Sequence, residues 1–285
     1  PLCDLPAFAR RMVKSREDLS KLFGKKPVVT DTTEMLMSSG IYQSLAEAGF
    51  KGALLDGRPW VMEWREPTHL YHMGKDMALL ARHYELSDDV GYRFSNKSWS
   101  GFPLYADSYA HWLRETWGDF AVLAWDYETF GEHHSRDTGI LEFMRHLPDE
   151  MSRRDIRTLM PSEIIDEYSD RSFQLPLPAF PCTWAGNGGM EFFLGNAAQQ
   201  AVFQLMLLAY NKALLTKNKQ LIDIAIWLLQ SDNLHLIQWF GRSGSEAEVS
   251  AYFTPQEWWR LGPNGIIWEI QQVYKNFINA LDAYL

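Results

Sequence analysis

The sequence predicts an α/β protein in which a parallel, barrel-type sheet is followed by a helical region. Strand-like and helix-like segments alternate from about residue 27 to about residue 147, which is typical of a parallel α/β architecture. After about residue 185 the pattern changes to long helical segments with no obvious strand between them. We therefore expect a (β/α) barrel domain over residues 1–185 and a helical region packed on it over residues 186–285.

The individual elements follow from punctuation and from apolar runs. A helix over residues 38–48 is expected because Ser38 can cap its first turn and Gly49 can end it. The other elements are predicted from their periodicity and their flanking glycines and prolines. They are, in chain order, a helix at 7–22, strands at 27–30, 50–55 and 69–72, a helix near 75–85, a strand at 90–94, a helix at 105–117, a strand at 120–125, and helices at 197–216, 218–231 and 265–284.

Residues 120–125 are the clearest strand in the sequence, because they form a continuous apolar run that ends abruptly at Asp126. Such runs are typical of parallel strands buried on both faces. In parallel barrels the active site lies at the C-terminal ends of the strands. An acidic side chain at that end of the barrel, where water is largely excluded, has its pKa raised toward that of a general acid. One such acid alone can equally be a helix cap. Acids stand after other predicted strands as well, and these are Asp31, Glu34, Asp56, Asp88 and Asp89.

The bulk composition excludes several classes of protein. A net charge of −9 argues against a nucleic-acid partner, which needs clustered Lys and Arg. No apolar stretch is long and uncharged enough for a membrane span. The two cysteines, Cys3 and Cys182, make neither a disulfide framework nor a zinc site, and reduced thiols are compatible with a cytoplasmic location.

The segment from Asp126 to His134 carries two further acids and two histidines, which invites a metal-site interpretation. Its spacing matches no metal signature with a physical basis, so we expect neither a metal nor another cofactor. A metal-dependent deacetylase remains an alternative that bound metal would reveal.

Several motifs resemble those of glycoside hydrolase family 57, in particular its α-amylase branch. Residues 125–134 resemble the family's fourth signature, in which the first Asp is the general acid/base. Residues 22–27 followed by 31–34 resemble the third signature of the branch, whose Glu is the nucleophile. Runs similar to other motifs of the branch occur in the family's order at 86–95, 183–184, 193–196 and 229–232. The resemblance implies a seven-stranded barrel of the family-57 type.

The activity implied by this resemblance is retaining hydrolysis of α-1,4-glucosidic bonds in starch, glycogen or maltooligosaccharides. Glu34 would be the nucleophile and Asp126 the general acid/base. Substrate-binding candidates are aromatic residues for stacking, histidines for hydrogen bonds to hydroxyls, and acids. They are Trp60, Trp64, Trp184, Trp239, His133, His134, His235, Asp88, Glu128 and Asp232. Each has a structural alternative: a place in the core for a Trp, an internal hydrogen bond for a His, or an ion pair with Arg93 for Asp88.

The match to the family has gaps. The first two signatures of the family are not present, so we expect an incomplete barrel whose open strand edge a second copy of the chain could cover. The subsites are expected to differ too, because Asp31 and Thr32 stand where the branch commonly has Arg and Asn. Two other functions stay open: an α-glucanotransferase of the same family, and a catalytically weak α-glucan-binding protein.

Overall fold

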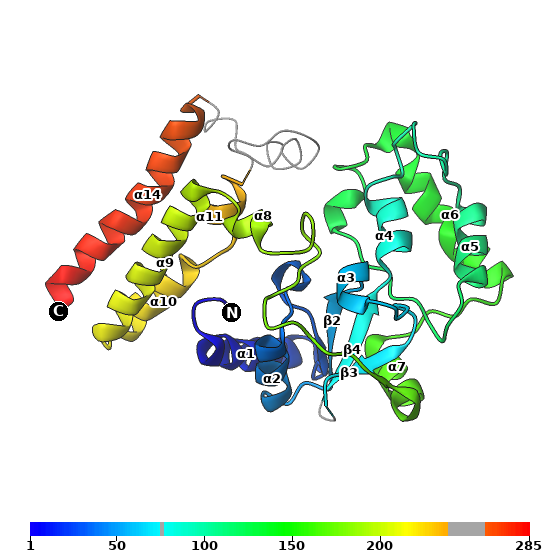
Figure 1. Cartoon of the computed structure of the whole chain (residues 1–285), viewed down its shortest axis with the longest axis horizontal. Coiled ribbons are helices and arrows are strands. Elements are labelled where there is room, and N and C mark those ends of the chain that lie inside the picture. The colour runs from blue at the N-terminus through cyan, green and yellow to red at the C-terminus, as the bar shows by residue number, and fades with distance from the viewer. Residues whose placement is uncertain (75–76, 239–259) are drawn as a thin grey trace. The chain divides into compact units, whose positions relative to one another are not determined.

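The computed structural model describes residues 1–74, 77–238 and 260–285. The chain forms two compact units, Pro1–Trp184 and Ala185–Leu285 (Figure 1). The first unit holds a sheet with helices around it, and the second is helical in its described residues. The α/β class expected from the sequence is therefore present.

The sheet of the first unit is mostly parallel. Its strand order is β1-β2-β4-β3-β5, in which β1, β2 and β4 run parallel, β3 is antiparallel to β4, and β5 is parallel to β3. The central strands β2 and β4 are apolar and almost fully buried, as expected for strands covered on both faces. The strands are β1 (Val29–Thr30), β2 (Gly52–Asp56), β3 (Leu70–His72), β4 (Ala78–Arg82) and β5 (Phe173–Gln174).

The helices of the first unit bury their apolar faces on this sheet and on one another. Tyr109 is fully buried among α4, α5 and α6, its ring lies 5.6 Å from that of Phe143, and its hydroxyl donates to the Leu86 carbonyl at 2.7 Å. The helices are α1 (Leu5–Phe23), α2 (Ser39–Glu47), α3 (Pro59–Met62), α4 (Tyr84–Gly91), α5 (Ala106–Glu115), α6 (Ile140–Arg153) and α7 (Pro161–Tyr168).

The predicted helix at 38–48 is confirmed, together with its capping residue and its terminating glycine. The Ser38 hydroxyl accepts from the Ile41 amide at 3.3 Å, and Gly49 adopts a φ of +78° just beyond the helix. The strands expected near 27–30, 50–55 and 69–72 and the helices at 7–22 and 105–117 are also present, as β1, β2, β3, α1 and α5.

Two predicted elements are wrong. The helix expected near 75–85 is largely replaced by β4, whose apolar residues pair with β2 on one side and β3 on the other. The strand expected at 90–94 is instead the end of α4 and the turn after it. Leu86, Val90 and Phe94 are all buried in one cluster. The helical i, i+4 spacing of these apolar residues therefore decided the structure over the strand preference of the β-branched and aromatic residues at 90–94.

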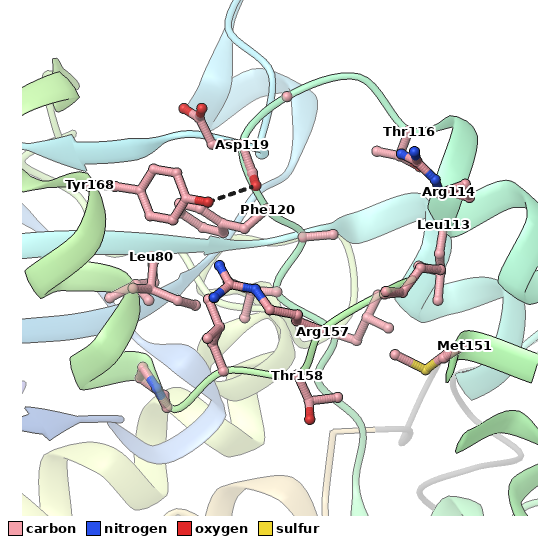
Figure 2. Close-up of a pocket in the computed structure, with 18 of the residues that line it drawn as sticks. Leu80, Leu113, Arg114, Thr116, Asp119, Phe120, Met151, Arg157, Thr158 and Tyr168 are labelled. Atoms are coloured by element: carbon pink, nitrogen blue, oxygen red, sulfur yellow. Dashed lines mark hydrogen bonds between the residues drawn. The ribbon is translucent and has the colours of Figure 1, made fainter. Parts of the chain in front are cut away.

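Residues 120–125, predicted as a strand buried on both faces, form only an isolated parallel bridge and are partly buried. Val122 forms a single parallel bridge with Arg82, and the His83 amide donates to the Val122 carbonyl at 2.7 Å. The segment is only partly buried, because a cavity of about 560 Å³ lies against it. Figure 2 shows Phe120, Arg157 and Tyr168 around this cavity. Self-association that covers an open barrel edge stays a prediction.

The second unit is built from helices that begin at side-chain caps. The Asn196 side chain accepts from the Gln199 amide at 2.8 Å, and Asn218 caps the next long helix in the same way. Tyr210, Ala213, Ala225 and Leu281 form a buried cluster of this unit. The helices are α8 (Glu191–Leu194), α9 (Ala197–Leu215), α10 (Lys219–Trp227), α11 (Asp232–His235) and α14 (Gly262–Ala280). In the described ranges of the chain, none of the helices has the length and apolar character needed to cross a membrane.

Candidate active site

Glu34 lies in a short 3-10 turn, Thr33–Met35, that follows β1. Its φ of +56° is in the left-handed region, which costs a residue other than glycine on the order of 1 kcal/mol. Two contacts from a distant loop hold this conformation: the Thr183 hydroxyl and the Trp184 amide both donate to the Glu34 carbonyl, at 2.5 and 3.1 Å. The turn therefore presents a half-buried carboxylate at the C-terminal end of a parallel strand.

The Trp184 side chain also contacts the Glu34 carboxylate. Its indole Nε1–H donates to Oε2 of Glu34. Two arginines also contact Trp184. The Arg82 guanidinium lies 5.4 Å from the centroid of the Trp184 ring, and Arg58 donates to the Trp184 carbonyl. A hydrogen bond to the carboxylate favours its ionised form, which is the form required of a nucleophile.

Arg82 ends β4 and is the centre of a buried charge cluster. Only 3% of it is exposed, and it donates to Asp56 at 3.1 Å, to Asp88 at 2.6 Å and to the Ala124 carbonyl at 3.0 Å. Arg58 donates to the second oxygen of Asp56 at 2.7 Å. Burial raises the pKa of Asp56, and the two arginines oppose this rise. Two cations thus face two carboxylates, and the Arg82 contact to Ala124 ties the segment that ends in Asp126 to the sheet.

Asp126 follows that segment directly and opens the turn Tyr127–Thr129. The residue is exposed, yet partial burial of its carboxyl group raises its pKa, and Glu128 raises it further, while His133 and Arg82 lower it. A raised pKa favours the protonated form of the carboxyl group, which is the form that a general acid requires. Asp126 and Trp184 line the same small cleft, whose other lining residues are Arg82, Gly91, Tyr92, Trp125, Thr129 and His133.

Tyr92 also lines this cleft. Although the residue is 61% exposed, partial burial, together with the charges of Asp88, Asp126 and Glu34, raises the pKa of Tyr92 to about 12. Trp184, whose indole N–H donates to the Glu34 carboxylate, lines the same cleft as Asp126. The structure therefore brings the two predicted catalytic residues to one site from segments about 90 residues apart in the chain.

The neighbouring histidines of the Asp126 segment have different places. His133 is half-buried and lines the cleft, beside the exposed Glu128. His134 is 3% exposed, with Nδ1 at 2.8 Å from the Ser95 hydroxyl and Nε2 at 3.0 Å from the Gly91 carbonyl. Both ring nitrogens of His134 are thus engaged inside the protein, which gives this residue a structural place rather than the expected contact with sugar.

Asp88 is also internal. It is 7% exposed and pairs with Arg82, whereas Arg93 pairs with Asp89 at 2.7 Å. The ion pair with Arg93 that the sequence offered to Asp88 and Asp89 is formed by Asp89, and Asp88 pairs with Arg82 instead, whose position depended on β4.

Each of the remaining predicted residues is absent from the lining of the cleft, belongs to the second unit, or lies outside the described residues. Trp60 and Trp64 on and after α3 are 49% and 80% exposed and do not line it. Asp232 and His235 belong to α11 of the second unit. Trp239 lies outside the described residues.

A family model and individual relatives show which family the chain belongs to. The model of glycosyl hydrolase family 57 matches residues 1–178. This chain belongs to glycosyl hydrolase family 57. A Methanocaldococcus jannaschii protein named "Putative alpha-amylase" is 36% identical over 199 residues, a match that covers 69% of this chain and 43% of that protein. The chain thus spans less than half of that relative's length.

Two solved structures share the fold of this family-57 chain. One is a GH57-type branching enzyme from Pyrococcus horikoshii, with a TM-score of 0.64, 15% identity, and coverage of 98% of this chain and 62% of that one. The other is a GH57 branching enzyme from Thermococcus kodakaraensis, with a TM-score of 0.62, 14% identity, and coverage of 98% and 63%. The predicted fold class, an incomplete (β/α) barrel followed by a helical region, is confirmed. At these identities the likeness concerns the fold alone.

The sequence analysis missed Arg82, Arg58 and Tyr92. For Arg82 a signal exists, since a polar residue ends an apolar run just as Asp126 does, but the helix predicted near 75–85 concealed it. Tyr92 stands within the family motif at 86–95 with no signal that sets it apart. Among the residues that the structure describes, no group of three or more His, Cys, Asp or Glu could hold a metal ion.

Proposed function

We propose that this family-57 chain provides the catalytic site of a retaining α-glucan hydrolase of the α-amylase type, which cleaves α-1,4-glucosidic bonds. The observation that carries the proposal is that the environments of the two carboxylates favour opposite protonation states. Glu34 receives the indole N–H of Trp184, which favours its ionised form, whereas burial raises the pKa of Asp126. Retaining glycosidases need this division of roles between a nucleophile and an acid.

In the first step Glu34 attacks the anomeric carbon and forms a glycosyl ester. Asp126 donates its proton to the glycosidic oxygen, so that the shortened glucan leaves as a neutral alcohol. The Trp184 N–H donates to Oε2 of Glu34 and so helps to orient the carboxylate for the attack. Retaining geometry requires the two carboxyl groups to be about 5–5.5 Å apart.

In the second step water attacks the anomeric carbon while the ionised Asp126 takes its proton, and the carboxylate of Glu34 is the leaving group. The ester bond to Glu34 breaks, the product keeps the α-configuration, and both residues return to their initial protonation states. The positive charge of Arg82, which lowers the pKa of Asp126, favours the ionised form needed here. A sugar hydroxyl in place of water would give transfer instead of hydrolysis.

Substrate recognition is proposed for the side chains that line the cleft. Trp184 and Trp125 offer aromatic faces, and His133 and Tyr92 offer groups that hydrogen-bond to hydroxyls. The name of the Methanocaldococcus jannaschii relative supports an α-glucan as the substrate.

The test is product analysis with the parent chain and isosteric variants. Soluble starch and maltoheptaose are incubated with the parent, Glu34→Gln, Asp126→Asn and the control Glu132→Gln, which changes an exposed acid of the same loop. Loss of roughly a thousandfold or more in kcat/KM in the first two, with the control unchanged, is the expected result. NMR of the first product formed should show the α-anomer. Persisting activity in both variants would refute the assignment, and longer products would indicate transfer.

A further inference from the structure

A second group of aromatic residues lies on the surface of the first unit, outside the cleft. Trp117 is 73% exposed and Phe173 is 51% exposed. Their rings flank His69 with centroid distances of 5.0 and 5.3 Å, at interplanar angles of 80° and 65°. We call these three residues the His69 patch. None of them lines the cleft of Asp126 and Trp184.

Polar contacts hold the centre of the His69 patch in place. Nδ1 of His69 lies 2.8 Å from Oδ2 of Asp119, and Arg171 donates to Oδ1 of the same carboxylate at 3.3 Å. His69 and Asp119 have side chains only 15% and 19% exposed, whereas the Arg171 side chain is 60% exposed. A guanidinium with free N–H groups therefore lies at the edge of the aromatic surface.

The backbone that carries the two exposed rings is equally constrained. Phe173 belongs to β5, where it pairs with Tyr71 of β3. Trp117 precedes Gly118, whose φ is +133° and where an added Cβ would lie 2.3 Å from the Thr68 side chain. Only glycine fits that close approach, so the loop holds Trp117 in one place. Rings fixed before binding lose little conformational entropy when a ligand stacks on them.

This combination has a specific chemical complement. Tightly packed proteins bury large aromatic side chains, and two exposed rings on one rigid surface mark an interaction site. A purely apolar partner would take water away from the Arg171 guanidinium, whose side chain is 60% exposed, without offering it an acceptor. A pyranose ring has an apolar C–H face for an aromatic ring and hydroxyls at its rim for charged hydrogen-bonding groups.

We propose that the His69 patch is a secondary α-glucan-binding site that holds polymeric substrate on the surface while cleavage takes place elsewhere. The inference rests on the proposed function for its ligand class. Trp117 supplies the main stacking surface, Phe173 the second one, and Arg171 hydrogen bonds to hydroxyls. The site retains long glucans and contributes nothing to short ones that fill only the cleft.

The experiment measures binding and turnover separately. Affinity electrophoresis in gels containing glycogen is run in the Glu34→Gln background, so that no polymer is consumed. Trp117→Ala is compared with Trp227→Ala, which removes a tryptophan of the same 73% exposure from α10 of the second unit. We expect roughly tenfold weaker glycogen binding for Trp117→Ala, a smaller loss for Phe173→Ala, and no change for the control. Thermal unfolding should be alike in all, because the side chains removed are exposed.

Turnover by the otherwise unchanged chain gives the second readout. Trp117→Ala should raise KM on glycogen and leave kcat/KM on maltotriose within twofold of the parent. Equal glycogen binding by Trp117→Ala and its parent would overturn the inference and leave the proposed function intact. A change of oligomeric state without a change in glycogen binding would overturn it too, in favour of a protein interface. If the parent bound glycogen through Trp117 but released no product, the inference would stand and the proposed hydrolysis would fall.

Discussion

The hydrogen bond from Trp184 to Glu34 can be tested by replacing the indole with a ring that has no donor. Trp184→Phe keeps an aromatic face toward Arg82 and removes the Nε1–H that Oε2 of Glu34 accepts, together with part of the indole ring. A hydrogen bond to a charged group contributes about 1.5–3 kcal/mol. Since each 1.36 kcal/mol is tenfold in rate, kcat/KM should fall about ten- to hundredfold at neutral pH.

The pH profile separates this effect from simple disruption of the site. Without the donor, the ionised form of the nucleophile is less stabilised, so the acidic limb of kcat/KM on maltoheptaose should move to higher pH. Trp125→Phe is the matched control, because it removes another indole N–H of the same cleft, which donates to the Ser87 carbonyl at 2.7 Å. The control can lower stability but should leave the acidic limb in place. A kcat/KM within twofold of the parent for Trp184→Phe, or an equal shift of the limb in both variants, would refute the reasoning.

Two further predictions concern stability. Arg82→Met leaves the buried carboxylates of Asp56 and Asp88 without their shared cation, so urea unfolding should show a loss of about 3–5 kcal/mol in the free energy of unfolding. The control Arg93→Met breaks a more exposed ion pair and should cost less than about 1 kcal/mol. Similar losses in the two variants would contradict the stabilising role of Arg82 in the buried charge cluster. Partial burial raises the pKa of Asp31 to about 6, although the residue as a whole is exposed, so the folded state favours the protonated carboxyl group. The stability that this confers is lost as pH rises from about 4 through 6. Asp31→Asn keeps an acceptor for the Thr32 amide and should gain Tm relative to the parent across that interval, by a small amount because the residue is exposed; a parent that gains relative to the variant would reverse the sign.

The sequence by itself determined the family, the fold class and the two candidate carboxylates. Local signals carried these conclusions: an apolar run that ends in Asp126, a cap at Ser38, and motifs in the order typical of the family. Such signals depend on neighbours in the chain, which is why they could be recognised without a structure.

Only the tertiary structure decided which side chains surround the carboxylates. A four-residue apolar run such as 78–81 fits a helix or a strand, and its pairing with β2 and β3 made it a strand that ends in Arg82. Adjacent histidines separated in the same way, with His133 in the cleft and His134 in the core. The indole N–H of Trp184 reaches Glu34 across 150 residues of sequence. No local pattern encodes such a contact, because it exists only once the intervening chain has folded and brought the two segments together.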